Sequence, residues 1–213
     1  YVILGPSGCG KTTLLSLMGG LDIPKSGTVL FKNQDISRYG LELHRRKNVS
    51  FIFQNYNLIE SLRIKDNILF SLRINNIDPK IQQERLNQLT KQLNIEEILD
   101  KYPLQCSGGQ QQRAAIARAL IMKPKIIFAD EPTGNLDCEN AKELMELFKK
   151  INKENHTTIV MVTHDSLVAS YSNRLLYLED GKISKCLEKN NKTQEEYYRD
   201  IIAITTKMDL AHV

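Results

Sequence analysis

A glycine-rich segment near the start of the chain constrains the fold more than any other feature. Residues 5–12 read Gly-Pro-Ser-Gly-Cys-Gly-Lys-Thr, which fits the pattern G-x-x-x-x-G-K-[ST]. An apolar run, Val2–Leu4, precedes the segment, and Lys11–Met18 reads as a helix that follows it. Glycines let backbone N–H groups turn inward on a phosphate, and the helix N-terminus adds a favourable dipole. The segment therefore predicts a phosphate-binding loop; a glycine-rich turn before an ordinary helix is the alternative.

Two side chains of this loop have specific expected roles. Lys11 would reach the β- and γ-phosphates of a bound nucleotide, and Thr12 would give its hydroxyl to Mg²⁺. The candidate nucleotide-binding residues of the loop are Gly5, Pro6, Ser7, Gly8, Cys9, Gly10, Lys11, Thr12 and Thr13.

The rest of the chain alternates between strand-like and helix-like patterns. Short apolar, β-branched or aromatic stretches predict strands at Val2–Leu4, 28–31, Val49–Phe53, 126–129, 158–162 and 175–178. Expected helices are Lys11–Met18, one that opens at Asp78 and Pro79, 107–122, 139–152 and a C-terminal helix over about 195–205. The alternation predicts an α/β fold with a parallel sheet in a single domain over residues 1–213. Together with the glycine-rich segment, this arrangement resembles the core of a P-loop NTPase. Residues of about 55–123 are mostly helical and are expected to form a subdomain inserted into that core.

Composition argues against several other classes of protein. The formal charge of +4 is modest and spread along the chain, and a solvated surface explains the basic cluster 44–47, so no nucleic-acid partner is expected. The four cysteines form no CxxC pair, which argues against zinc and against a disulfide framework and suits a reducing cytoplasm. No apolar run approaches the roughly 20 residues that span a bilayer, and no signal peptide is recognised. We therefore expect the chain to contact a membrane only through another protein.

A pair of acidic residues ends one of the expected strands. The apolar stretch 126–129 leads directly into Asp130 and Glu131. Asp130 would hold Mg²⁺ at the edge of the sheet beside the phosphate-binding loop. Glu131 is placed to orient or deprotonate an attacking water. Two adjacent acids at a solvated strand end are the alternative.

Polar residues also follow two further strands. Gln54 comes directly after Val49–Phe53, and His164 comes closely after the stretch 158–162. Ligands of α/β proteins bind at the carboxyl ends of the strands, which makes both residues candidates for the site. A hydrogen-bonded glutamine or histidine at the rim of the core is the alternative.

Small and polar residues open the helix expected over 107–122. Ser107 and Gln110 have the spacing of a capping box, with Gly108 and Gly109 between them. A helix N-terminus of this composition is also an anion site with nothing nearby in the sequence to occupy it. Both interpretations stay open at this point.

Taken together, these motifs resemble those of the ATP-binding cassette (ABC) transporter ATPases. The family's order and spacing are matched over essentially the whole chain by the phosphate loop, Gln54, the Ser-Gly-Gly-Gln signature from Ser107, Asp130 with Glu131, the loop Gly134-Asn135-Leu136-Asp137, and His164. The resemblance implies an enzyme that hydrolyses ATP to ADP and phosphate, coupled to transport, with ATP and Mg²⁺ as cofactors. It also implies a small antiparallel β part, which we expect to be truncated at its N-terminus because the sequence reaches the phosphate loop at once.

The resemblance further implies how the site works. Family members form head-to-tail dimers that enclose two ATP molecules, so the signature of one copy would face the γ-phosphate held by Lys11 of the other. The signature residues that would bind ATP are Ser107, Gly108, Gly109 and Gln110. Catalytic roles fall to Glu131, His164 and Gln54, metal-binding roles to Thr12, Gln54 and Asp130, and a place in the dimer seam to Asp137. Opening and closing of the dimer would drive a transmembrane permease subunit, which places the chain at the inner face of the cell membrane.

The chain departs from the family pattern in two places. The signature begins with Cys106 where the family has leucine, and because that position packs inside the protein we expect function to survive. The aromatic residue that stacks on adenine in the family lies upstream of the phosphate loop and falls outside this sequence.

Finer details point to one branch of the family. The segments 19–22, 53–59 and 132–137 look like the branch of lipoprotein-release, macrolide-export and antimicrobial-peptide-resistance ATPases. The segments 163–174 and 194–198 are most similar to the bacitracin-type peptide-resistance exporters. We therefore expect export of, or resistance to, an antimicrobial peptide or lipid-linked substrate. A regulatory ATPase of the cell-division type and a lipoprotein-release ATPase are the alternatives, while DNA-repair ATPases are disfavoured because the insert is short and no CxxC is present.

Overall fold

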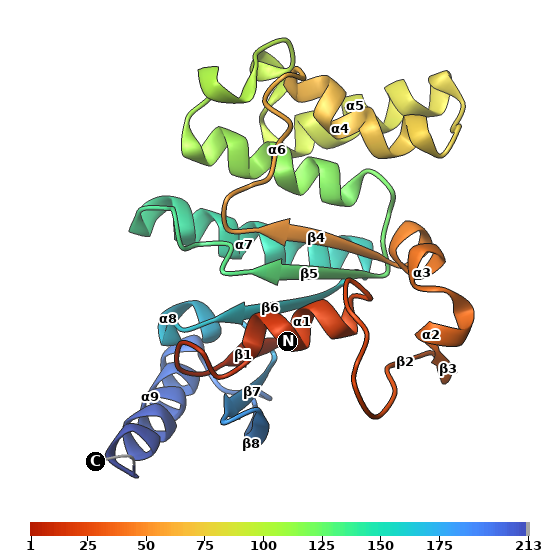
Figure 1. Cartoon of the computed structure of the whole chain (residues 1–213). Helices are drawn as coiled ribbons and strands as arrows, with labels where there is room; N and C mark the ends of the chain where they lie inside the picture. Colours follow the sequence, from red (N-terminus) through yellow and green to blue (C-terminus); the bar gives the residue numbers. More distant parts are fainter. Residues whose placement is uncertain (212–213) are drawn as a thin grey trace.

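A six-stranded sheet runs through the middle of the protein, in a computed structural model that describes residues 1–211 (Figure 1). Its strand order is β4-β5-β6-β1-β7-β8. The strands are β1 (Val2–Leu4), β4 (Val49–Phe53), β5 (Ile126–Asp130), β6 (Thr158–Thr163), β7 (Arg174–Glu179) and β8 (Lys182–Glu188). Neighbours from β4 to β7 pair in parallel, and β8 pairs antiparallel with β7. The predicted α/β fold with a parallel sheet is confirmed.

Apolar residues on both sides of the strands explain why helices cover both faces of the sheet. Ile3 packs in one cluster with Leu15 of α1 (Lys11–Met18). Val2 and Leu4, which alternate with Ile3, pack in the other cluster with residues of α7 (Cys138–Asn155). In Figure 1, α1 lies in front of the sheet and α7 behind it. A strand buried on both faces reads as a continuous apolar run, as β1 and β5 do.

Three helices lie together above the β4 edge of the sheet in Figure 1. They are α4 (Ile64–Ile74), α5 (Pro79–Leu93) and α6 (Gly108–Leu120), with short 3-10 turns at Glu96–Ile98 and Pro103–Gln105. The two predicted helix starts are confirmed. The Asp78 side chain accepts from the Lys80 N–H at 2.8 Å, and the reciprocal capping box of Ser107 and Gln110 is formed. Helix α6 ends at Leu120, two residues before the predicted end.

Several short elements escaped the sequence patterns. The expected strand 28–31 is right only for β2 (Leu30–Phe31), which pairs antiparallel with β3 (Gln34–Asp35) in a separate two-stranded sheet. The helices α2 (Ile36–Tyr39), α3 (Leu41–Lys47) and α8 (Ser166–Ala169) were not foreseen. Strand β8 was missed because six of its seven residues are exposed, which leaves no apolar alternation to read.

The C-terminal helix α9 (Gln194–Ala211) is longer than the 195–205 expected from the sequence. It is anchored at its first turns, where Tyr197 is fully buried and its hydroxyl donates to the Leu187 carbonyl at 3.2 Å. Across the described part of the chain, none of the helices combines the length and the apolar character needed to traverse a bilayer.

Candidate nucleotide-binding site

The register of the sheet brings the distant motifs to one edge. Leu4 lies opposite Thr163, and Asp130 lies opposite both Phe53 and Val162 on its two neighbours. Because these strands are parallel, the residues that follow them emerge at the same edge. The residues that follow are Gly5, Gln54, Glu131 and His164.

The phosphate loop has the backbone geometry that its glycines permit. Gly8 and Gly10 have φ of 80° and 99°, values that other residues rarely adopt. Gly5 is needed for a different reason, because a Cβ there would lie 2.2 Å from the Leu178 carbonyl oxygen. Lys11 is buried, and its Nζ donates to the carbonyls of Gly5 and Pro6 at 2.9 Å each. The ammonium group is thus held inside the loop, facing the place where an anion would sit.

Two oxygen-bearing side chains meet beside this loop. The Thr12 hydroxyl donates to Oδ1 of Asp130 at 3.1 Å. Burial raises the pKa of Asp130, and the neighbouring charge of Glu131 acts in the same direction, while the Thr12 hydrogen bond and Lys11 oppose them. A hydroxyl and a carboxylate are the hard oxygen ligands that Mg²⁺ takes in nucleotide sites.

The protein side chains alone do not form a closed metal cage. Among the described residues there is no cluster of three or more His, Cys, Asp or Glu side chains that could hold a metal ion. This agrees with the chemistry of Mg²⁺, which is usually held by one or two protein groups together with substrate phosphates and water. The pair Thr12 and Asp130 therefore fits Mg²⁺ bound with a nucleotide.

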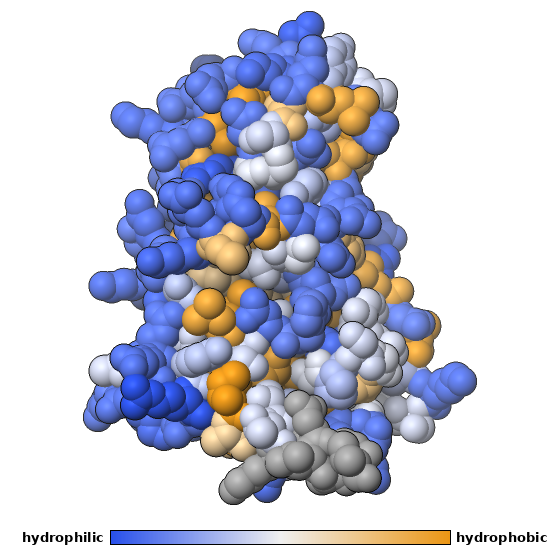
Figure 2. Space-filling model, turned by 90° about the vertical axis from the view of Figure 1, so that its left-hand side faces the viewer, coloured by the Kyte–Doolittle hydropathy of each residue, from blue (hydrophilic) through white to orange (hydrophobic). Residues whose placement is uncertain are grey.

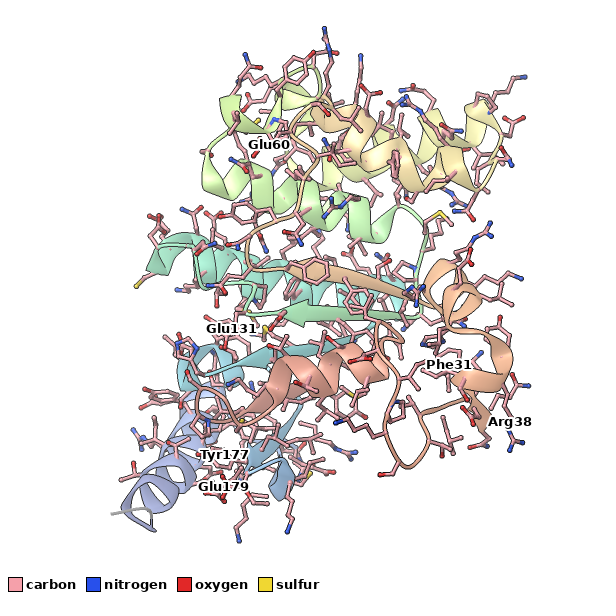
Figure 3. All side chains as sticks on the ribbon, in the orientation of Figure 1. Phe31, Arg38, Glu60, Glu131, Tyr177 and Glu179 are labelled. Carbon is pink, nitrogen blue, oxygen red and sulfur yellow. The ribbon has the colours of Figure 1, made fainter. Side chains whose placement is uncertain are left out.

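Glu131 stands at the carboxyl end of β5, where Figure 3 labels its side chain. Its Oε1 lies 3.0 Å from Nδ1 of His164, a hydrogen bond in which His164 donates whenever Glu131 carries its negative charge, because a carboxylate only accepts. The Glu131 side chain is 18% exposed and that of His164 is 66% exposed. A carboxylate in this position can take a proton from a bound water, and the hydrogen bond to His164 fixes the orientation of the carboxylate.

Gln54 is exposed and lies against the loop that follows Glu131. A Cβ on Gly134 would come within 2.6 Å of Nε2 of Gln54, so the end of the Gln54 side chain lies close to the Gly134 backbone. The Asn135 side chain donates to the Gln54 carbonyl at 2.9 Å and to Oδ1 of Asn55 at 3.2 Å. The loop after β4 and the loop after β5 are therefore joined directly.

The signature segment, residues 107–110, contacts other parts of the chain than the phosphate loop. The hydrogen bonds of Gln110 return to Ser107 and reach Glu97 at 3.3 Å. A Cβ on Gly109 would come 3.1 Å from Oδ1 of Asn140, in the first turn of α7. Asp137 caps that turn by accepting from the backbone and side-chain N–H groups of Asn140 at 2.8 Å each, and these bonds lower the pKa of Asp137.

Sequence reasoning assigned no role to three polar side chains that link these loops. They are Gln112, Arg118 and Asn135. Gln112 is 1% exposed, and the other buried residues of α6 are apolar. A glutamine among the apolar positions of a helix is the sequence signal that could have identified it, because a buried amide needs a hydrogen-bond partner. Arg118 donates to the carbonyls of Tyr56 and Asn57, and burial lowers its pKa.

Figure 2 looks onto the end of the molecule at which the parallel strands finish. Hydrophilic side chains dominate this face, and the hydrophobic ones are scattered among them. Such a surface suits a charged, hydrated ligand better than an apolar one.

Comparison with known proteins identifies the family. Residues 1–134 match the family model described as ABC transporter. The chain belongs to the ABC transporter family. It is 43% identical over 203 residues to the bacitracin export ATP-binding protein BceA of Halalkalibacterium halodurans, a match that spans 94% of this chain and 80% of BceA. It is 40% identical over 209 residues to the ABC transporter ATP-binding protein YxdL of Bacillus subtilis, spanning 97% and 81%.

Solved structures of ABC proteins share the fold. The dimeric ATP-binding cassette MJ0796, in a post-hydrolysis state with ADP and Pi, is 38% identical with a TM-score of 0.79, over 88% of this chain and 84% of MJ0796. The ABC transporter component cbiO1 of Clostridium perfringens is 29% identical with a TM-score of 0.83, over 100% and 86%. The ABC chain described here is accordingly an ATP-binding, ATP-hydrolysing subunit of a membrane transporter.

Proposed function

We propose that this ABC subunit powers export of, or resistance to, an antimicrobial peptide or a lipid-linked substrate. The single observation that carries the catalytic part is the meeting of Lys11, the Thr12–Asp130 pair and the Glu131–His164 pair at one sheet edge. The similarity to the bacitracin export protein of H. halodurans supports the substrate class.

The proposed site divides its tasks among these residues. The loop 5–13 holds the phosphates of ATP, with Lys11 on the β- and γ-phosphates. Thr12, Asp130 and Gln54 hold Mg²⁺, which when bound neutralises charge that develops on the phosphates. Glu131 accepts a proton from the attacking water, and His164 keeps the carboxylate in place and contacts the γ-phosphate.

The active form that we propose is a head-to-tail dimer with two bound ATP molecules. The contacts of the signature residues 107–110 are with Glu97, Tyr56 and Asn140 of α7, none of which belongs to the phosphate loop, so in this proposal a second copy brings them to a nucleotide. Asp137 then lies in the seam, and Ser107 remains a helix cap while its hydroxyl meets the γ-phosphate. Dimeric structures of the similar cassette MJ0796 support this arrangement.

Closure of such a dimer depends on the γ-phosphate, because that group is contacted from both sides. Hydrolysis removes the bridge, and the dimer, docked at the inner face of the cell membrane, passes the opening motion to a transmembrane permease. In this proposal residues 1–213 form one nucleotide-binding domain, with about 55–123 as its helical subdomain and 195–205 within its C-terminal helix.

The proposal is tested by replacing Glu131 with glutamine. We expect E131Q to bind ATP, to lose hydrolysis and to run as a dimer in size-exclusion chromatography with ATP and Mg²⁺, but as a monomer with ADP. E84Q, a change of the same type on the exposed face of α5, should hydrolyse ATP like the unaltered protein. If E131Q stays monomeric at saturating ATP, or hydrolyses ATP at the unaltered rate, the shared-site mechanism is wrong.

A further inference from the structure

We propose that Gln112 is a positioning residue that ties the signature helix α6 to Glu131, so that each signature segment reports on the catalytic carboxylate of its own chain. The inference rests on the role proposed above for Glu131. It concerns the hydrogen bond from Nε2 of Gln112 to the carbonyl oxygen of Pro132, at 3.1 Å.

The backbone of Glu131 is in a conformation that must be held. Its φ is 44°, in the left-handed region that residues with a side chain seldom occupy. Glu131 is followed by Pro132, whose ring further restricts the residue before it. Such conformations persist only where the surroundings over-determine them, and they cluster at functional sites.

Four hydrogen bonds surround this strained residue. The Glu131 N–H donates to the Val162 carbonyl at 3.1 Å, and the Gly134 N–H donates to the Glu131 carbonyl at 3.0 Å. His164 holds the carboxylate, and Gln112 holds the next carbonyl along the chain. Three of these bonds come from β6, its end and the same loop. The remaining bond, from Gln112, comes from α6, which lies with α4 and α5 above the sheet (Figure 1).

Packing alone does not explain a glutamine at this place. Gln112 is 1% exposed, and its Oε1 has no hydrogen-bond partner among the described residues. Because the Pro132 carbonyl can only accept, the NH₂ group must face it, which fixes the orientation of the amide. An apolar side chain of similar volume would avoid burying an unpaired oxygen, so the amide serves the bond to Pro132.

Helix α6 is also bound to the other catalytic loop. Nη2 of Arg118 donates to the Tyr56 carbonyl at 2.7 Å, in the loop that begins with Gln54. The helix thus starts at Ser107, contacts the Glu131 loop through Gln112 and contacts the Gln54 loop through Arg118. If the N-terminus of α6 at Ser107 moves toward a nucleotide on the partner, Gln112 moves with the helix. The hydrogen bond to the Pro132 carbonyl then shifts the loop that holds Glu131.

The test replaces Gln112 with methionine, which keeps the volume and removes the donor. We expect kcat for ATP hydrolysis to fall about 10- to 100-fold through misplacement of Glu131, with KM for ATP changed less than about twofold. Q82M on α5 is the matched control, since Gln82 also donates from its side-chain amide to a backbone carbonyl, that of Ile77 at 2.8 Å. Its kcat should equal that of the unaltered protein. An unchanged kcat in Q112M overturns the proposal, as does an equal loss in Q82M.

A second variant gives a readout that a merely structural role would not move. In Q112E the protonated carboxyl can donate to the Pro132 carbonyl, whereas the ionised form cannot. The ratio of its kcat to that of the unaltered protein should therefore rise as pH falls, and a ratio independent of pH counts against the proposal. In the E131Q background, Q112M should still dimerise with ATP. If E131Q itself fails to dimerise, the dimer model is lost, but the kcat ratios still decide the role of Gln112.

Discussion

Replacing Gly19 with alanine should strain the contact between α1 and β4. Gly19 follows α1 as its C-cap with φ of −82° and ψ of −4°, a negative-φ conformation that alanine can also adopt, so the main effect comes from space. An added Cβ would lie 2.1 Å from Cζ and 2.8 Å from Cε1 of Phe51. The Phe51 ring has little room to retreat, because it stacks on Phe53 and Phe128 with centroid distances of 5.7 and 5.5 Å.

The expected size follows from the energetics of overpacking. Forcing an extra carbon into a filled core costs about 1–3 kcal/mol. For a chain of this length each kcal/mol lowers Tm by about 2–4 °C, so G19A should melt about 2–12 °C lower. Thermal unfolding followed by circular dichroism, with urea titration as a check, measures the loss.

A double-mutant cycle separates the clash from other causes. F51L removes the atoms that the new Cβ would meet, at its own cost in packing. If the clash is real, the free energy of unfolding that G19A/F51L loses should be smaller than the sum of the losses of the two single variants, by about 1 kcal/mol or more. The reasoning would be refuted if the free energy of unfolding of G19A lay within about 0.5 kcal/mol of that of the unaltered protein, or if the effects of G19A and F51L were additive.

Two further predictions concern titrating carboxylates. Because hydrogen bonds from Asn140 lower the pKa of Asp137 below its ordinary 3.8, the stability it contributes is present above that value and is lost as pH falls through the lowered pKa. D137N keeps the cap without titrating, so its Tm should fall less steeply at acid pH. If the Tm of D137N falls with pH as steeply as that of the unaltered protein, the prediction is wrong. Burial raises the pKa of Asp130, so its charge costs stability above its ordinary pKa. D130N should melt higher than the unaltered protein at pH 7 without nucleotide, and should hydrolyse ATP on the order of 100-fold more slowly; a lower Tm would count against the burial argument.

The local motifs of this protein were readable because each depends on neighbours in the sequence. The strand, loop and helix from Val2 to Met18, the cap at Asp78 and the capping box at Ser107 follow from residues within a few positions. The parallel sheet followed from apolar runs separated by helical segments. Short or exposed elements such as β3, α2 and β8 could not be found in this way, since they bury too few side chains to leave a pattern.

The sequence by itself determined the fold class and the family, and it predicted the residue types of the candidate site. The tertiary structure decided which of those residues touch. The hydrogen bond of Thr12 to Asp130 spans 118 positions and that of His164 to Glu131 spans 33, and both depend on strand register. The links of Gln112 to Pro132 and of Arg118 to Tyr56 depend on how α6 packs beside the sheet. Such contacts are absent from any local pattern, because they arise only when separate elements are brought together by burial of their apolar faces.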